Sequence, residues 1–182
     1  MTTESPASAY DMGHAVEAEN LATFAVLVDN EPGVLHRVVG LFAARGYNIE
    51  SLTVAETDRN AHTSRVTIVT RGTPHVLAQI EAQLTKMVST RHVQDVTRDP
   101  NGLERELALV KVKGTGADRV EALRVADIFR AKVIDTTHES FVFELTGAPS
   151  KIDKFADLMR PLGLVEVSRT GVLSIQRGVE VL

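Results

Sequence analysis

The sequence predicts an α+β fold made of two consecutive units with the same order of elements. Three observations support this prediction. Short apolar segments typical of strands are followed along the chain by segments whose apolar residues have the spacing of one helix face. The order strand, helix, strand, strand, helix, strand then occurs twice. Between the two occurrences stands the turn-forming segment Asp99-Pro100-Asn101-Gly102.

The first unit is expected over residues 21–98. Residues 21–28 form an apolar run rich in strand formers and predict a buried strand. Pro32 is expected in the first turn of the helix that follows, where its missing N–H costs nothing, and Gly46 is expected as the left-handed cap at its end. The other elements are expected as strands at 47–56 and 65–70, a helix opening at 72–74 and a strand at 88–96.

The second unit is expected over residues 106–182, after a linker at 99–105. Its elements are expected as strands at 107–112, 132–137, 140–145 and 164–168, helices at 119–131 and from 147–150 to Met159, and a further strand at 172–175. Both units have the βαββαβ order of a ferredoxin-like domain. Residues 1–20 are small, polar and acidic, and predict a disordered N-terminal extension.

Composition excludes several classes of protein. The 182 residues carry a net charge of -4, which argues against a dedicated nucleic-acid binder, and aromatic residues make up 4% of the chain, too few for the stacking surface of an RNA-recognition module. The absence of cysteine excludes disulfides and thiolate metal sites. No apolar run is long enough to span a membrane, and the N-terminus lacks the pattern of a secretory signal.

The loop between the first strand and the first helix is the strongest candidate site. A helix start leaves about four backbone N–H groups unpaired and carries a partial positive charge, so it attracts carboxylates. Gly33 has no side chain to block the approach, and Val34 and Leu35 offer further N–H groups. Asn30 is placed to cap the helix or to accept a hydrogen bond from an ammonium group. The loop therefore suits the backbone end of a free amino acid.

A second interpretation of the same residues remains open. Many helices begin with a polar cap, a proline and a glycine and bind no ligand. Asn48, which follows Gly46 and Tyr47, has the same ambiguity, because asparagine is common in turns that use the left-handed region.

Longer segments resemble a known family. Residues 30–35, NEPGVL, resemble the ligand turn of ACT domains, which are ferredoxin-like amino-acid sensors. Residues 40–54, GLFAARGYNIESLTV, resemble the signature of acetohydroxyacid (acetolactate) synthase small subunits. Further segments similar to that family lie at 64–68, 79–84, 104–111, 128–135 and 165–172. The resemblance covers nearly all of residues 21–178.

The resemblance implies a regulatory role in the biosynthesis of valine, isoleucine and leucine. Members of the family have no catalytic residues, bind a separate catalytic large subunit, activate it and confer feedback inhibition by valine or a related amino acid. Thiamine diphosphate, Mg and FAD are expected in that catalytic subunit, with no cofactor in this chain. A cytoplasmic location is expected.

The resemblance also implies a site shared between two chains. N-terminal ACT domains are expected to pair in a homodimer, with the effector at their interface. One chain would contribute Asn30, Gly33, Val34 and Leu35, and the other would contribute Asn48 and Ile49.

Other functions have weaker support. The six histidines, at 14, 36, 62, 75, 92 and 138, lack the spacing of a metal site on a predicted helix, so no metal site is expected. No nucleophile elbow or phosphate-binding loop occurs, so no catalytic residue is assigned. The alternative function is an amino-acid-responsive regulator of another enzyme or of transcription, although no helix-turn-helix segment is apparent.

Overall fold

The computed structural model describes residues 17–58 and 60–179. Most of the expected N-terminal extension, residues 1–16, lies outside the described residues. Asn20, expected as the last residue of the extension, is the first residue of strand β1.

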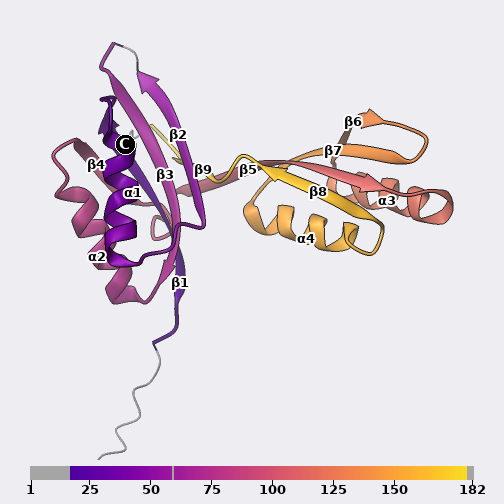
Figure 1. The fold of residues 1–182 in the computed structure, drawn as a ribbon, viewed down its shortest axis with the longest axis horizontal. Helices are drawn as coiled ribbons and strands as arrows, with labels where there is room; N and C mark the ends of the chain where they lie inside the picture. The colour runs from indigo at the N-terminus through magenta and orange to yellow at the C-terminus, as the bar shows by residue number, and fades with distance from the viewer. Residues whose placement is uncertain (1–16, 59, 180–182) are drawn as a thin grey trace, which may run out of the picture.

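The first unit is a four-stranded antiparallel sheet with two helices on one face (Figure 1). Its elements are β1 (Asn20–Asp29), α1 (Val34–Arg45), β2 (Ser51–Asp58), β3 (Thr63–Gly72), α2 (Pro74–Thr85) and β4 (Thr90–Asp95). The strands are ordered β2-β3-β1-β4, so the first strand lies in the interior of the sheet. The expected βαββαβ order is confirmed for this unit.

Alternation along β1 builds the core of the first unit. Phe24, Val26 and Val28 are each 0% exposed and point toward the helices, as period-2 alternation requires. Val38 and Phe42 of α1 pack against them from the helical layer. This packing fixes the position of α1, and therefore of the loop that precedes it, on the sheet.

The second unit repeats the architecture of the first. Its elements are β5 (Gly102–Lys113), α3 (Gly116–Phe129), β6 (Lys132–Thr136), β7 (Ser140–Gly147), α4 (Pro149–Met159) and β8 (Leu164–Arg169), followed by β9 (Leu173–Gln176). The order β6-β7-β5-β8 matches the first sheet position by position. In the core, the rings of Phe143 and Phe155 meet edge to face with centroids 6.0 Å apart. The expected fold, two ferredoxin-like units in tandem, is confirmed.

The connection between the units differs from the expected linker at 99–105. Residues 102–105 of that segment form the first part of β5 and pair with β9, from Gly102 opposite Gln176 to Arg105 opposite Leu173. The turn itself is tight, because the N–H of Gly102 donates to the carbonyl of Asp99 at 2.9 Å. β5 thus runs from the first unit into the second, and β9 returns beside it (Figure 1).

Within residues 17–58 and 60–179, none of the helices combines the length and the apolar character needed to cross a membrane.

Candidate functional site

A type II turn joins β1 to α1. The N–H of Val34 donates to the carbonyl of Glu31 at 3.2 Å, which closes a four-residue turn. Gly33 occupies the third position with φ 86° and ψ -3°, values that require glycine, and Pro32 occupies the second position, which proline favours. Because α1 begins only at Val34, Pro32 lies before the helix, and the expectation that it is in the first helical turn is wrong.

The turn leaves backbone donors available at the start of α1. In the described part of the chain, the N–H groups of Gly33, Leu35 and His36 have no acceptor. A Cβ atom at Gly33 would meet no atom within 4 Å, so the space beside these donors is open. The positive end of the helix dipole lies at the same place. The geometry therefore suits a carboxylate.

Val34 differs from its neighbours. Its N–H is already bonded to Glu31, and its side chain is 7% exposed and packs in the core. Val34 therefore holds the turn in place rather than offering a free donor. Leu35, by contrast, is 39% exposed and presents an apolar side chain beside the open N–H groups.

Asn30 does not cap α1, contrary to one of the two roles expected for it. The N-cap residue is Gly33, and no side chain caps the helix. The reason is the type II turn, which places Glu31 and Pro32 between Asn30 and the cap position. The Asn30 amide instead donates to Glu56 Oε1 at 3.4 Å, across to β2.

Asn48 and Ile49 lie in the segment between α1 and β2. Gly46 ends α1 with φ 68°, as the sequence predicted. The carbonyl of Asn48 accepts a 2.6 Å hydrogen bond from the buried Thr70 hydroxyl, which anchors the segment to β3. The exposed Asn48 side chain donates through Nδ2 to Glu50 Oε1 at 3.0 Å. Ile49 is partly buried against the core.

The two halves of the expected site lie at opposite ends of α1 within one chain. The helix has 12 residues, and at 1.5 Å per residue it is about 18 Å long. Gly33 precedes the helix and Asn48 follows it, so one chain does not bring them around the same small ligand.

Glu50 is a neighbour of the site that the sequence did not single out. It accepts the hydrogen bond from Asn48, and it lines an open cleft of about 520 Å³ that also includes Asn48, Arg45 and Arg71. Glu50 lies two residues after Asn48 in the segment 40–54 that resembles the family signature, but nothing in that pattern indicates its contact with Asn48.

Metal binding has no geometric support in the described residues. No three side chains of histidine, aspartate or glutamate there are grouped so that they could hold an ion. His14, one of the six histidines, lies outside the described residues.

Each unit matches a family model. Residues 24–92 match a model described as "AHAS small subunit-like ACT domain", and residues 105–178 match one described as "Small subunit of acetolactate synthase". The chain is also 46% identical over 156 residues to the probable acetolactate synthase small subunit of Archaeoglobus fulgidus, covering 86% of this chain and 96% of that relative. The chain belongs to the family of acetolactate synthase small subunits.

Other members of the acetolactate synthase small-subunit family are similar over the same region. The chain is 44% identical over 158 residues to the isozyme 3 small subunit of Escherichia coli K12, covering 86% of this chain and 96% of that relative. A crystal structure of the small subunit from Thermotoga maritima is 37% identical and superposes with a TM-score of 0.77, covering 88% of this chain and 99% of that one. The resemblance found in the sequence motifs is thereby confirmed.

Proposed function

We propose that this chain is the non-catalytic, regulatory subunit of an acetolactate synthase. It binds the catalytic large subunit, raises its activity and confers feedback inhibition by valine or a related branched-chain amino acid. The observation that carries the proposal is the similarity to small subunits at 44–46% identity over nearly their whole length. Thiamine diphosphate, Mg and FAD belong to the catalytic partner, and the assembly works in the cytoplasm.

The start of α1 supports amino-acid binding. The open N–H groups of Gly33, Leu35 and His36 offer hydrogen bonds to a carboxylate, and the helix dipole adds a favourable field. Leu35 offers an apolar contact for a branched side chain. The Asn48 side chain of the second chain provides an amide oxygen that can accept a hydrogen bond from the effector's ammonium group.

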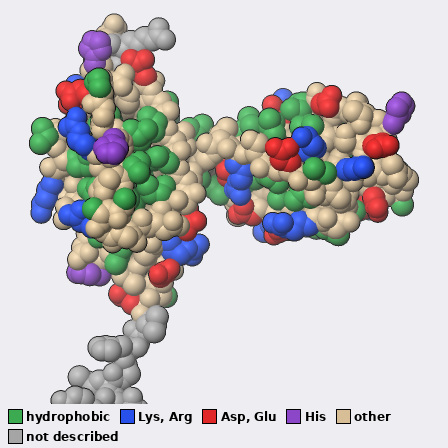
Figure 2. Space-filling model, viewed as in Figure 1, with side chains coloured by type: hydrophobic (Ala, Val, Ile, Leu, Met, Phe, Trp, Pro, Cys, Tyr) green, Lys and Arg blue, Asp and Glu red, His purple; other side chains and the backbone are tan. Residues whose placement is uncertain are grey.

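The surface beside α1 supports a homodimer. Leu35 and Val39, one turn apart on α1, are 39% and 37% exposed, and Val54 on β2 is 44% exposed. Figure 2 shows hydrophobic side chains gathered on one face of the first unit. Adjoining exposed apolar side chains are typical of protein interfaces. In a two-fold dimer the same patch of both chains meets, so Gly33 of one chain can approach Asn48 of the other at two equivalent sites.

The expected affinity is modest. A sensor of metabolite level needs a dissociation constant of about 1 µM to 1 mM. A few backbone hydrogen bonds, one ammonium contact and a small apolar pocket are enough for this affinity. The best small ligands gain at most about 1.5 kcal/mol per heavy atom, and a ligand the size of an amino acid reaches the required range within that limit.

Reconstitution tests the proposal. The purified chain is added to the catalytic subunit encoded in the same organism, and acetolactate formation is measured with and without valine, leucine or isoleucine. We expect the chain to raise activity and to make it sensitive to at least one of the three. Unchanged activity and no inhibition would refute the proposal, and acetolactate formation by the chain alone would refute its non-catalytic part.

A further inference from the structure

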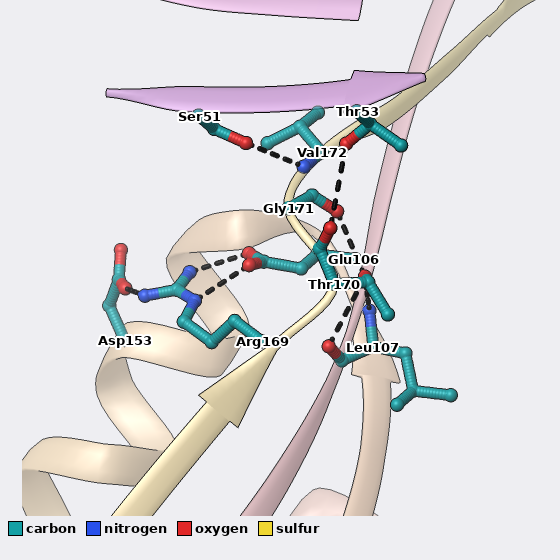
Figure 3. Close-up of polar contacts among 9 residues, drawn as sticks. All are labelled: Ser51, Thr53, Glu106, Leu107, Asp153, Arg169, Thr170, Gly171 and Val172. Atoms are coloured by element: carbon teal, nitrogen blue, oxygen red, sulfur yellow. Dashed lines mark hydrogen bonds and ion pairs between the residues drawn. The ribbon is translucent and has the colours of Figure 1, made fainter. Parts of the chain in front are cut away.

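Two side chains of β2 hold a loop of the second unit. Ser51 Oγ accepts a hydrogen bond from the backbone N–H of Val172 at 3.1 Å, and Thr53 Oγ1 donates to the carbonyl of Thr170 at 3.5 Å (Figure 3). Gly171 lies between these two bonds with φ 83°. A Cβ atom there would be 2.6 Å from Ser51 Oγ and 2.9 Å from Thr53 Oγ1. The close approach therefore requires glycine both for its backbone and for its size.

The same loop is fixed to the second unit on its other side. The N–H of Thr170 donates to the carbonyl of Leu107 at 3.0 Å, and the N–H of Leu107 donates back to Thr170 Oγ1 at 3.2 Å. The preceding residue, Arg169, makes a two-pronged ion pair with the buried Glu106 (Figure 3). Because these bonds tie it to β5, the 170–172 loop moves with the second unit.

On the β2 side, the contact begins three residues after Asn48. The intervening Glu50 is held to β3 by its N–H, which donates to the carbonyl of Val69 at 2.8 Å. Its carboxylate accepts the bond from Asn48, and Glu50 also lines a second cleft together with Ser51, Glu106 and Gly171. Glu50 thus borders both the candidate effector residue and the boundary between the two units.

We infer that the contact of Ser51 and Thr53 with the 170–172 loop carries the effector signal from the first unit to the second. This inference rests on the proposed function. An effector whose ammonium group bonds to Asn48 Oδ1 turns the Asn48 side chain toward itself, and this reorientation breaks the bond from Asn48 Nδ2 to Glu50. The freed carboxylate and the start of β2 then take up new positions beside Gly171, and the second unit shifts with the loop. Ser51, Thr53 and Gly171 are therefore positioning residues that do not touch the effector.

The residual activity at saturating valine distinguishes a defect in signal transfer from a defect in effector binding. A variant that only weakens binding needs more valine but reaches the same residual activity at saturation. A variant that breaks the transfer binds valine and keeps a higher residual activity at any concentration, because the two states of the complex are no longer coupled.

Matched substitutions test the inference in the reconstituted holoenzyme. The combined variant Ser51→Ala with Thr53→Val removes both side-chain bonds, and Gly171→Ala closes the space between them. The control for β2 is Thr57→Val, because Thr57 also lies on that strand but bonds to Thr63 within the first unit. The control for glycine is Gly178→Ala, because Gly178 has φ 95° and no atom within 4 Å of a Cβ.

We expect both test variants to activate the catalytic subunit and to bind valine in equilibrium dialysis. At saturating valine, their residual activity should be about threefold or more above that of wild type, with both controls unchanged. Plateaus equal to wild type would overturn the inference while leaving the proposed function intact. If the wild-type chain binds no branched-chain amino acid, the proposed function itself fails. If Gly171→Ala does not fold, the side-chain variant decides alone.

Discussion

Gly33 and Asn48 lie at opposite ends of α1, which begins directly after Gly33 and ends three residues before Asn48. A ligand the size of valine cannot reach both in one chain, since the helix between them is about 18 Å long. If both residues bind one effector, two chains must meet there. The proposed effector site therefore requires the proposed homodimer, and a test of one also tests the other.

Replacing Gly33 with aspartate should abolish the response to valine. The new carboxylate would occupy the open space beside the free N–H groups and repel the effector's own carboxylate. We expect no inhibition at valine concentrations that inhibit the wild-type holoenzyme fully, with activation of the catalytic subunit retained. Activity of the reconstituted holoenzyme across a valine series measures both properties.

Gly116→Asp is the matched control for backbone strain. Gly116 is the first residue of α3, it has a positive φ of 58°, and a Cβ there would also meet nothing within 4 Å. It lies in the second unit, away from the proposed effector site. An equal loss of valine response in both variants would mean that strain, and not the charge at Gly33, is responsible.

Arg169 should stabilise the second unit. Its Nε and Nη2 donate to the two oxygens of Glu106 at 2.7 and 2.5 Å, and its Nη1 donates to Asp153 at 2.7 Å. The Glu106 side chain is only 3% exposed, so Arg169→Met leaves a buried carboxylate without its partner. We expect a loss of about 2 kcal/mol in the free energy of unfolding by urea, below the range for a fully buried pair because Arg169 is partly exposed.

Arg160→Met controls for the loss of a surface charge. Arg160 pairs with Asp157 at 3.1 Å, and both side chains are 69% exposed. Its removal should change the free energy of unfolding by about 0.5 kcal/mol or less. Similar losses in the free energy of unfolding for Arg169→Met and Arg160→Met would show that the burial of Glu106 adds nothing to the stabilising effect of its ion pair.

Lys111 should control the titration of Glu166 across the β5–β8 pair. Its hydrogen bond of 2.7 Å, and then its charge, lower the pKa of Glu166 below the usual value. The pKa of Glu166 is lower in the folded than in the unfolded chain. The ion pair therefore stabilises the fold at pH values above the unfolded pKa of about 4.3. This stabilisation is lost as the pH falls through the folded pKa. Lys111→Met should raise the pKa of Glu166, as measured by carboxyl ¹³C NMR.

Lys113→Met provides the comparison on the same strand. Its ammonium group is 3.8 Å from Glu139 and makes no ion pair with Glu166. The titration of Glu166 should therefore stay as in wild type, and an equal shift in this variant would contradict a specific role for Lys111.

The order of the elements could be predicted because it depends on local pattern. The apolar run that contains Phe24, Val26 and Val28 is visible in the sequence, as is the helical spacing that places Val38 and Phe42 on one face. Glycine at 46 marks the end of α1 for a local reason, its left-handed backbone.

The features that were missed depend on distant partners or on exact turn geometry. Gly102 to Arg105 belong to a strand because β9, some 70 residues later, pairs with them. The bond between Ser51 and Val172 joins residues 121 positions apart, and no pattern near either residue indicates it. The cap role of Asn30 failed because a type II turn displaces the helix start by a few residues.

A mixed dimer of two inactive variants tests the central claim most directly. Gly33→Asp and Asn48→Ala chains are produced together with different affinity tags, and the dimer containing one of each is purified through both tags. If each site combines Gly33 of one chain with Asn48 of the other, the mixed dimer has one intact site and one doubly altered site. Valine binding by equilibrium dialysis should then show about half the wild-type stoichiometry, with none in either homodimer. A mixed dimer that binds no valine, beside a wild-type dimer that does, would contradict a site shared between two chains.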